Sequence, residues 1–286
     1  MTDLTTKLMT APVVHVLAHT GFDAGGLNTW MEFRGFGDAV TFEASPIKKI
    51  AEGSNVTANA DQAEIVAEVA GRFCYNSFQK GRDSAEYLAN VVEMQHGSVL
   101  EHVNYTFLIE GVSRALTHEL IRHRAGFAVS QESQRYVDAK DISFVVPPLM
   151  LHQCGNDLDH PRIQKFAERC ERALGDYKAE QEAYADELEA ADDVKTKTVI
   201  KKRANEAARS VLPNASETKL TWTGNLRALR HFIELRGDDH ADLEIRRLAT
   251  AIAEIMIERA PFAFFDVQTF EGDFGVGVVA VENHKV

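Results

Sequence analysis

The chain has 286 residues, of which 45% are hydrophobic and 26% are charged, as in ordinary globular proteins. This length allows one large domain or two small ones, with room for a sizeable core. The formal net charge of −12 argues against a nucleic-acid or anionic-membrane surface, because either would need a broad basic face. No apolar run approaches the ~18 residues of a membrane helix, and the first residues lack a signal-peptide pattern, so we expect a cytoplasmic protein.

The three cysteines, Cys74, Cys154 and Cys170, are an odd number without a CxxC pair. This pattern argues against a disulfide framework and against a zinc ribbon. Cys74 could be a nucleophile, but a lone cysteine between two aromatic residues is more often buried. We therefore expect Cys74 to be buried and to have no catalytic role.

The segment from His118 to His123 contains two histidines and a glutamate, which invites comparison with a zinc-protease helix. That kind of site needs two histidines four positions apart on one helical face. Here the histidines are five positions apart, roughly 140° around a helix that turns about 100° per residue. We therefore expect no metal site.

Residues 1–60 are expected to form an N-terminal extension. Residues 1–12 have no clear pattern, whereas residues 13–17 are rich in β-branched side chains and predict a strand. Glycines punctuate residues 22–59, which predicts hairpin or loop structure. The glycines at 21–26 follow the strand but do not fit a dinucleotide or P-loop motif.

Residues 61–286 are expected to form one domain, because neither an internal repeat nor a clear linker interrupts them. Apolar spacing predicts helices over 62–73, 83–96, 112–124, 194–211 and 225–236, the first of them capped by Asp61. A longer helix is predicted from Pro161 to an acidic turn at 186–193. The last predicted helix runs from a cap at Asp238 or Asp239 to Pro261. Strands are predicted over 103–109 and 141–146. The fold class is α+β, mostly helical with a modest antiparallel or mixed sheet.

The densest group of polar side chains lies between Arg122 and Tyr136. These residues include three arginines, a histidine, two serines, two glutamines and a glutamate, interrupted by small or apolar residues at 125–129. A guanidinium fits a phosphate or a carboxylate through two hydrogen bonds, and Gln, Ser and Glu discriminate between heterocycles. In an acidic protein such a cluster indicates a small anionic ligand. Arginines at a helix end are also ordinary partners of the helix dipole, and that alternative stays open.

A second polar cluster extends from Asn225 to His240 and contains Arg227, His231 and Arg236. Arg227 and His231 are four positions apart on the predicted helix and therefore share a face. A single histidine beside an apolar stripe is often structural. Two histidines and two arginines this close together favour a functional site.

Together these stretches resemble the flavin-dependent thymidylate synthases over roughly residues 63–270. The resemblance depends on residues 98–102, 119–124, 130–136, 209–213 and 225–240. The family motif is Arg-His-Arg followed, after seven residues, by Ser. In this chain the eight residues 125–132 separate Arg124 from Ser133, so we place one extra residue within 125–129.

The resemblance implies the residues of two binding sites. For the substrate dUMP it implies Glu119, Arg122, Gln131, Glu132, Ser133, Gln134, Arg135, Arg209 and Arg236, with Arg236 at the uracil ring as the catalytic residue. For the cofactor FAD it implies Ser98, His102, Arg122, His123, Arg124, Gln131, Asn225, Arg227, His231 and His240.

The resemblance also implies an α+β fold, a homotetramer with active sites shared between subunits, and a reaction. Reduced FAD would supply the electrons, methylenetetrahydrofolate the carbon, and NADPH would re-reduce the flavin, so that no protein nucleophile is needed. Arg236 would stabilise negative charge on the pyrimidine ring.

Two alternatives stay open. A related flavin-dependent C5-methylase acting on another pyrimidine nucleotide, such as UMP, would have the same motifs. A non-catalytic nucleotide- or RNA-binding protein is the second alternative, and the net charge of −12 disfavours it.

Overall fold

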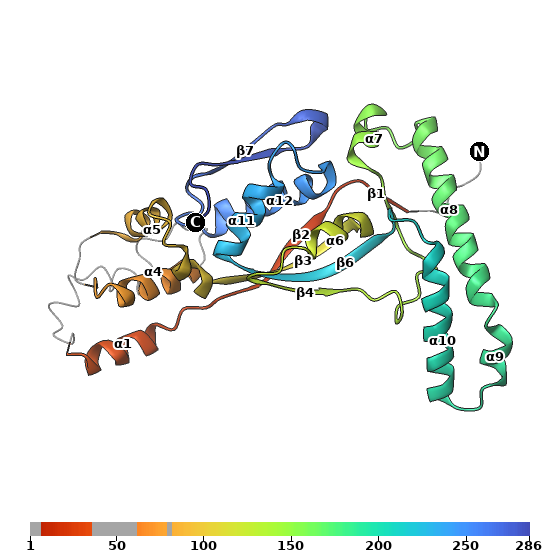
Figure 1. The fold of residues 1–286 in the computed structure, drawn as a ribbon, viewed down its shortest axis with the longest axis horizontal. Helices are drawn as coiled ribbons and strands as arrows, with labels where there is room; N and C mark the ends of the chain where they lie inside the picture. Colours follow the sequence, from red (N-terminus) through yellow and green to blue (C-terminus); the bar gives the residue numbers. More distant parts are fainter. Residues whose placement is uncertain (1–6, 36–61, 79–81) are drawn as a thin grey trace.

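The computed structural model of the protein describes residues 7–35, 62–78 and 82–286. At its centre lies an antiparallel sheet with the strand order β2-β3-β6-β4 (Figure 1). Its strands are β2 (Val13–His19), β3 (Asn104–Ser113), β6 (Glu217–Asn225) and β4 (Phe127–Gln131). The predicted α+β fold class is confirmed, and the predicted strand at 13–17 is an edge strand of this sheet.

One face of the sheet is buried, because side chains alternate between the two faces of a strand. Phe107 and Trp222 on the inner face are almost completely buried, whereas Leu108 on the outer face is exposed. Three helices cover the inner face: α6 (Arg114–Leu120), α11 (Leu226–Arg236) and α12 (Leu243–Arg259). The main hydrophobic core lies between this face and these helices.

Two small sheets flank the central one. β1 (Leu8–Met9) pairs in parallel with β5 (Phe144–Val145), and β7 (Val267–Phe270) forms an antiparallel hairpin with β8 (Val278–Val281). A short 3-10 helix, η3 (Asp273–Gly275), lies in the connection of this hairpin.

The remaining helices lie at the two ends of the sheet (Figure 1). At one end are α1 (Ala24–Phe33), α4 (Ala63–Cys74), α5 (Ser84–Glu93) and the 3-10 helix η1 (Gly97–His102). At the other are α7 (Pro148–Gln153), α8 (Pro161–Glu182), α9 (Ala185–Ala190), α10 (Val194–Ala208) and the 3-10 helix η2 (Arg209–Val211).

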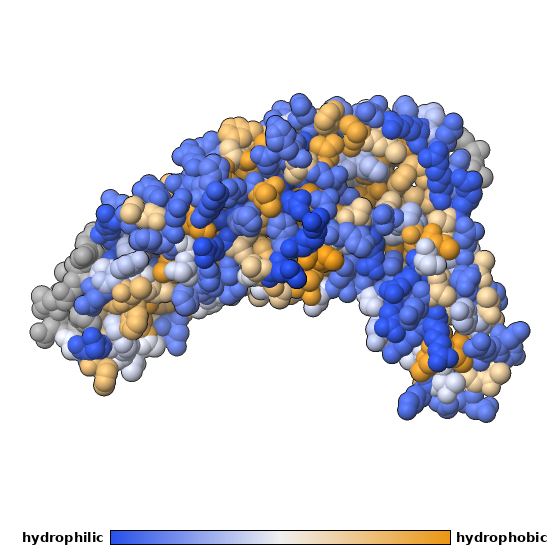
Figure 2. Space-filling view, in the orientation of Figure 1, coloured by the Kyte–Doolittle hydropathy of each residue, from blue (hydrophilic) through white to orange (hydrophobic). Residues whose placement is uncertain are grey.

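Helices α8 and α10 pack side by side as an arm that projects from the body, and Figure 2 shows a hollow between the arm and the body. The arm is held internally by Gln181, whose Nε2 donates to Asn205 Oδ1 at 2.7 Å and to Tyr177 Oη at 2.9 Å. None of the helices in the described ranges is long and apolar enough to cross a membrane.

The structure corrects the loop prediction for residues 22–59, because residues 24–33 form helix α1. Asp23 caps this helix by accepting a hydrogen bond from Gly26 N at 3.1 Å, and Leu27 and Met31 are buried in a small cluster with Phe78. The capping signal therefore outweighs the two glycines in the first turn. The loop prediction for residues 36–59 and the predicted cap at Asp61 lie outside the described residues.

The predicted helix over 112–124 is also wrong at both ends. Residues 112 and 113 belong to β3, and the helix ends at Leu120. The cap of the last predicted helix differs as well. Helix α12 is capped by Asp242, whose Oδ1 accepts from Glu244 N at 2.9 Å, and not by Asp238 or Asp239. Strands β1, β4, β6, β7 and β8 were not predicted.

Cys74, expected to be buried, is exposed at the end of α4, whereas Cys154 and Cys170 are buried. The reason is the direction of the helix face: α4 buries Ile65, Ala67 and, in its last turn, Arg72, whereas Phe73 and Cys74 lie on the opposite, exposed side of that turn.

A buried ion pair joins α11 to the carboxyl-terminal hairpin. Arg230 donates from Nη1 and Nη2 to Asp266 Oδ1 (2.8 Å) and Oδ2 (2.9 Å), and both side chains are at most 3% exposed. Asp266 also accepts hydrogen bonds from the main chain and side chain of Asn283. Burial alone would raise the pKa of Asp266, but these bonds outweigh it and lower the pKa.

Replacing Asp266 by Ala should therefore destabilise the fold by about 3–5 kcal/mol, because it leaves the Arg230 charge buried without a partner. The measurement is the free energy of unfolding in denaturant. The matched control is Glu101→Gln, which removes the exposed ion pair between Glu101 and Arg227 and should cost less than about 1 kcal/mol. Equal costs for the two variants would contradict the structural role of the buried pair.

Candidate active site

Helix α6 positions the first group of candidate side chains. Its N-cap is Ser113, whose Oγ accepts a hydrogen bond from Leu116 N at 3.1 Å. Glu244, in the first turn of α12, accepts from both N and Oγ of Ser113 at 2.7 Å. Burial raises the pKa of Glu244, and the bonds from Ser113 oppose that rise. The junction between β3 and α6 is therefore held firmly against α12.

Since α6 ends before Arg122, the residues Arg122, His123 and Arg124 lie in the turn that leads to β4. The side chains of Arg122 and Arg124 are exposed and that of His123 is half-buried. Gly126 in this turn has φ +77°, and a Cβ there would lie 2.7 Å from Cβ of Ala228. The turn therefore approaches the start of α11 more closely than any residue except glycine allows.

Arg236, the predicted catalytic residue, is the last residue of α11 and reaches across to α6. Its Nη1 donates to Glu119 Oε2 and its Nε donates to His123 Nε2, both at 2.9 Å. The side chains of Arg236 and Glu119 are 19% and 33% exposed, so this ion pair is partly accessible to solvent. An arginine has five N–H donors, and after these two bonds Arg236 still has donors for a ligand.

His123 is a neutral acceptor in this group. Its ring meets Phe127 and Phe232 edge-on, with centroid distances of 6.3 and 5.3 Å. Burial first, and then the charge of Arg236 and other nearby cations, lowers the pKa of His123 to about 4. Because Nε2 accepts from Arg236, the proton of the neutral ring is assigned to Nδ1.

A pocket of about 640 Å³ opens beside α6 and η2, and we call it the arginine pocket. Its lining includes Arg114, His118, Gln131, Gln134 and Arg209. Burial, and after it the charge of Arg209, lowers the pKa of Arg114, and the charge of Glu132 opposes this shift in part. Within the described part of the chain neither guanidinium forms an ion pair with a carboxylate. Two like charges share this pocket, and an anion between them would relieve their repulsion.

Gln131 forms a fixed part of the wall of the arginine pocket. Its Nε2 donates to Thr218 Oγ1 at 3.1 Å and to Thr117 Oγ1 at 3.3 Å. Because both NH₂ donors are used in this way, the amide oxygen of Gln131 remains available as an acceptor for a ligand.

Arg114 was missed by the sequence analysis, although a signal for it was present. Arg114 and His118 are four positions apart at the start of the predicted helix, so they share one helical face. The Arg-His-Arg motif drew attention to the other end of that helix.

A second pocket, of about 480 Å³, lies at the amino end of α11, and we call it the α11 pocket. It contains three predicted flavin residues, Asn225, Arg227 and His231, and the turn at Gly126. Asn225 is the N-cap of α11, its Oδ1 accepting from Ala228 N at 2.8 Å. Arg227 Nη1 lies 2.6 Å from Glu101 Oε1.

The other predicted residues lie outside these two pockets. Ser98 and His102 are exposed in η1. Arg135 forms an ion pair with Glu206 of α10 at 3.0 Å, and Glu132 donates its main-chain N–H to Lys219 O at 2.9 Å. Ser133 accepts a long hydrogen bond, 3.4 Å, from the main chain of Arg135.

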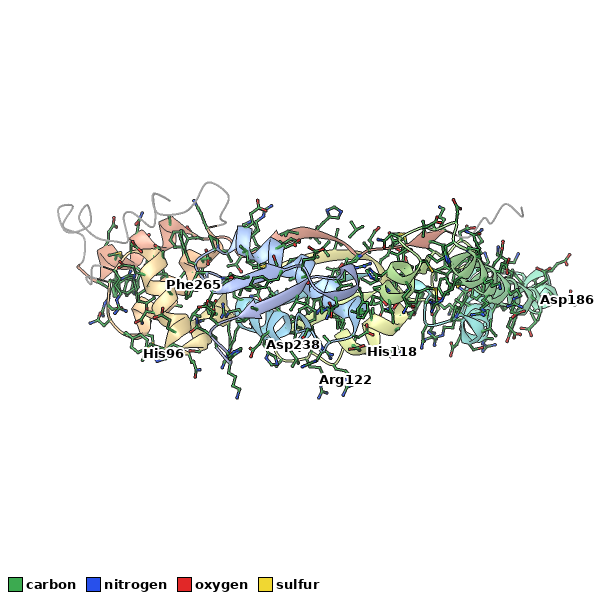
Figure 3. The ribbon with its side chains drawn as sticks, turned by 90° about the horizontal axis from the view of Figure 1, so that it is seen from above. His96, His118, Arg122, Asp186, Asp238 and Phe265 are labelled. Carbon is green, nitrogen blue, oxygen red and sulfur yellow. The ribbon has the colours of Figure 1, made fainter. Side chains whose placement is uncertain are left out.

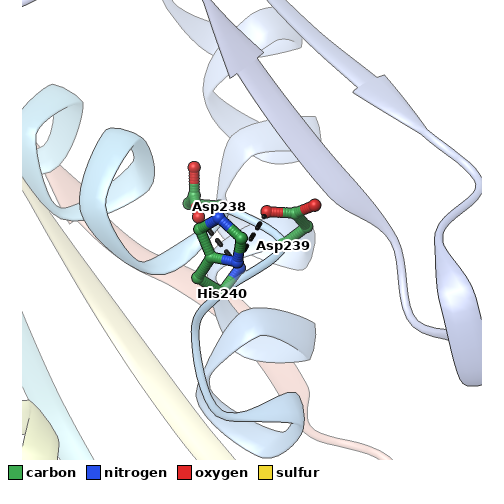
Figure 4. Close-up of side chains that lie close together, drawn as sticks. All are labelled: Asp238, Asp239 and His240. Carbon is green, nitrogen blue, oxygen red and sulfur yellow. Dashed lines mark hydrogen bonds and ion pairs between the residues drawn. The ribbon is translucent and has the colours of Figure 1, made fainter.

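Figure 3 places His118, Arg122 and Asp238 along one side of the molecule. His240 lines a further pocket of about 690 Å³ together with Arg236. Asp238, Asp239 and His240 form an exposed cluster (Figure 4). Asp238 Oδ1 accepts from His240 N at 2.9 Å, which is an ordinary turn contact between α11 and α12.

The α11 pocket fits the anionic and hydrogen-bonding part of a flavin nucleotide. Its floor at Gly126 has no side chain, and a Cβ there would lie 2.8 Å from Asn225 Nδ2. Asn225, Arg227 and His231 add an amide, a cation and an imidazole to this floor. Such donors suit a diphosphate or a heterocycle edge.

Comparison with known proteins agrees with this chemistry. Residues 55–262 match the family model described as thymidylate synthase complementing protein. The chain is 41% identical over 230 residues to a flavin-dependent thymidylate synthase of Mycobacteroides abscessus, which covers 78% of this chain and 84% of that protein. It is 44% identical over 220 residues to the enzyme of that name from Mycobacterium tuberculosis, covering 74% and 84%.

These matches confirm the resemblance seen in the motifs. The chain belongs to the family of flavin-dependent thymidylate synthases.

The state of His123 can be tested by NMR titration of its ring nitrogens. We expect a titration midpoint near 4 and an Nδ1–H tautomer above it. An unfolded chain binds this proton at about pH 6.5, so acidification from about 6.5 to 4 should favour unfolding. Arg236→Met should raise the midpoint, since it removes a nearby charge and the donor to Nε2. A wild-type midpoint near 6.5 would disprove the assigned contact.

Proposed function

We propose that the chain catalyses the reductive methylation of dUMP to dTMP, with methylenetetrahydrofolate as carbon donor and with FAD, re-reduced by NADPH, as hydride source. The observation that carries the proposal is the arginine pocket. Arg114 and Arg209 both line it, beside Gln131 and Gln134. Neither arginine forms an ion pair within the described residues, and the charge of Glu132 only partly offsets the fall in the pKa of Arg114. A nucleoside monophosphate supplies the dianion that such a pair requires, and a base edge suits the two amides.

The dUMP site would combine this pocket with the predicted residues Glu119, Arg122, Glu132, Ser133 and Arg135. Of these, Glu119 already contacts Arg236. The guanidinium of Arg236, aligned by Glu119 and His123, would face the pyrimidine ring and stabilise negative charge on it. His123, neutral because of its low pKa, orients Arg236 without adding a second charge.

The flavin would be held by Asn225, Arg227 and His231 in the α11 pocket. Ser98, His102, His123, Arg124 and His240 complete the set of proposed flavin residues, together with Arg122 and Gln131. When bound, the flavin supplies the reducing equivalents for the transfer, so the chain needs no nucleophile of its own.

The state of the cysteines also supports a reaction without a protein nucleophile. Cys154 and Cys170 are buried, and burial raises the pKa of the Cys170 thiol to about 11, so it is not a thiolate at neutral pH. Cys74 lies at the end of α4, at the far end of the molecule from the arginine pocket beside α6 and η2.

We also propose that residues 61–286 form the catalytic domain, with residues 1–60 as an extension of it. The enzyme would work in the cytoplasm, where nucleotide and folate substrates are available.

Four such chains would assemble into a homotetramer with shared active sites. In support, Ile121, Val129, Tyr136 and Val137, all around the polar stretch, are at least 44% exposed. Large apolar side chains left exposed beside a candidate site are typical of a surface that another chain covers.

Light scattering of the purified protein should give about four times the 31.8 kDa of one chain. Tyr136→Lys should shift the mass towards smaller species, because it places a charge among these apolar side chains. Lys165→Glu, on an exposed position of α8, is the control and should leave the mass unchanged. A monomeric wild-type protein would exclude shared active sites.

The proposed reaction is tested by tritium release from C5-labelled dUMP, with labelled UMP as a competing substrate. We expect release from dUMP that depends on methylenetetrahydrofolate. Arg236→Ala should lower kcat about 10²-fold with FAD still bound, as for loss of one charge-stabilising donor. Arg114→Ala should instead raise the KM for dUMP at least tenfold, because it removes a charged contact to the phosphate.

Two outcomes would overturn parts of this scheme. Faster tritium release from UMP than from dUMP would mean that UMP, and not dUMP, is the substrate. Wild-type rates for Arg236→Ala would remove Arg236 from the reaction and leave the binding assignments in place.

A further inference from the structure

The α11 pocket has a wall that lies outside the family match. Val281, Asn283, Lys285 and Val286 line it, whereas the family model matches residues 55–262 only. The sequence analysis assigned none of these residues to a site. The pocket that holds three predicted flavin residues is therefore completed by a segment, residues 283–286, with no assigned role.

This segment is held in place by several contacts. Arg227 Nε donates to the main-chain oxygen of Val286 at 3.0 Å, and Gln95 Nε2 donates to His284 O at 3.2 Å. The main-chain oxygen of Asn283 accepts a hydrogen bond from Arg230, and its main-chain and side-chain N–H groups donate to Asp266. Val286 is buried so closely against Gly97 that a Cβ on Gly97 would lie 2.5 Å from its carbonyl carbon. Segment 283–286 is therefore a built part of the pocket.

Lys285 has an unusual backbone within this segment. Its φ is +60°, in the left-handed region that residues with a side chain other than Asn and Asp rarely adopt. Its main-chain N–H is directed at Glu234 Oε2 (3.4 Å), and the ring of the preceding His284 contacts Glu234 Oε1 (3.0 Å). A strained conformation held by its surroundings often marks a functional position.

The charges around the pocket single out Lys285. The charge of Arg227 is balanced by Glu101 at 2.6 Å and that of Arg230 by Asp266. The remaining lining carboxylate, Glu234, is engaged by His284. Among the described residues that line this pocket, Lys285 is thus the cation without an ion-pair partner.

We propose that Lys285 is a cofactor-binding residue, whose ammonium binds the diphosphate of FAD in the α11 pocket. The proposal rests on the proposed function, because it takes this pocket as the flavin site. A diphosphate carries two negative charges, and its other proposed partner here, Arg227, is already shared with Glu101. Lys285, which follows in the same lining and has no ion-pair partner among the described residues, supplies the missing positive charge.

The test compares the affinity of apoprotein variants for FAD and for riboflavin, which lacks phosphate, by flavin fluorescence. Lys285→Asn removes the charge and keeps a residue that tolerates positive φ. It should weaken FAD binding about fivefold, as for loss of about 1 kcal/mol at an exposed charge contact, and leave riboflavin binding unchanged. Lys285→Arg should bind FAD like the wild type. Lys140→Asn, at an exposed position outside the pocket, is the matched control.

The outcomes separate this inference from the function on which it rests. Wild-type affinity of Lys285→Asn for FAD would overturn the role of Lys285 while leaving the flavin site in place. An equal loss for FAD and riboflavin would mean that Lys285 shapes the pocket and does not bind phosphate. A wild-type protein that binds neither flavin would overturn the proposed function itself. The melting temperatures of the flavin-free variants should agree, which shows that any loss of affinity is not a loss of fold.

Discussion

The candidate active site depends on the packing of aromatic rings around Trp222. This side chain is 1% exposed, lies parallel to Phe127 at 4.4 Å and meets Phe232 edge-on at 4.8 Å. Phe127 begins β4 and Phe232 lies in the middle of α11, so one buried indole joins the edge strand, the central strand and the helix above them. Gly224 is required beside this stack, because a Cβ there would lie 2.5 Å from Phe127. Aromatic contacts of this kind contribute beyond their buried area.

The position of Arg236 follows from that packing. With Asn225 capping α11 at the end of β6 and Phe232 on the stack, the last residue of the helix lies over α6. There Arg236 meets Glu119 and His123, two residues from a segment more than a hundred positions away in the chain. The same aromatic surface shields His123, and this burial is the main reason for its low pKa. Packing and electrostatics at the site therefore have a common origin.

The charges of this acidic protein are unevenly distributed in a way that matches its ligands. Buried cations such as Arg72 and Arg230 are neutralised by Glu68 and Asp266. The arginine pocket differs, because Arg114 and Arg209 line it without forming an ion pair within the described residues. Burial and the charge of Arg209 lower the pKa of Arg114, and the charge of Glu132 opposes this only in part. Because the whole chain has a net charge of −12, such a local positive site favours small anions that fit the pocket over extended polyanions.

Much of this could be read in the sequence. The helix between Asn225 and Gly237 was predicted within a residue, because its apolar spacing and caps are local signals. The start of the long helix at Pro161 was also predicted, but that helix ends at Glu182, and α9 (Ala185–Ala190) occupies part of the expected acidic turn. The family was recognisable from five stretches taken together, at 98–102, 119–124, 130–136, 209–213 and 225–240. Strand β6 was missed although Thr218, Leu220 and Trp222 alternate with polar neighbours, and helix α1 was hidden by its two glycines.

By itself, the sequence determined the fold class, the family and the residue types available for nucleotide and flavin chemistry, since periodicity and motifs are properties of neighbouring residues. Only the tertiary structure decided which of those residues meet. The pairing of Arg114 with Arg209, the contact of Arg236 with His123, and the closure of the α11 pocket by Lys285 all join distant segments. These contacts form because strand pairing and core packing bring the segments together. No pattern among neighbouring residues shows which distant segments will meet.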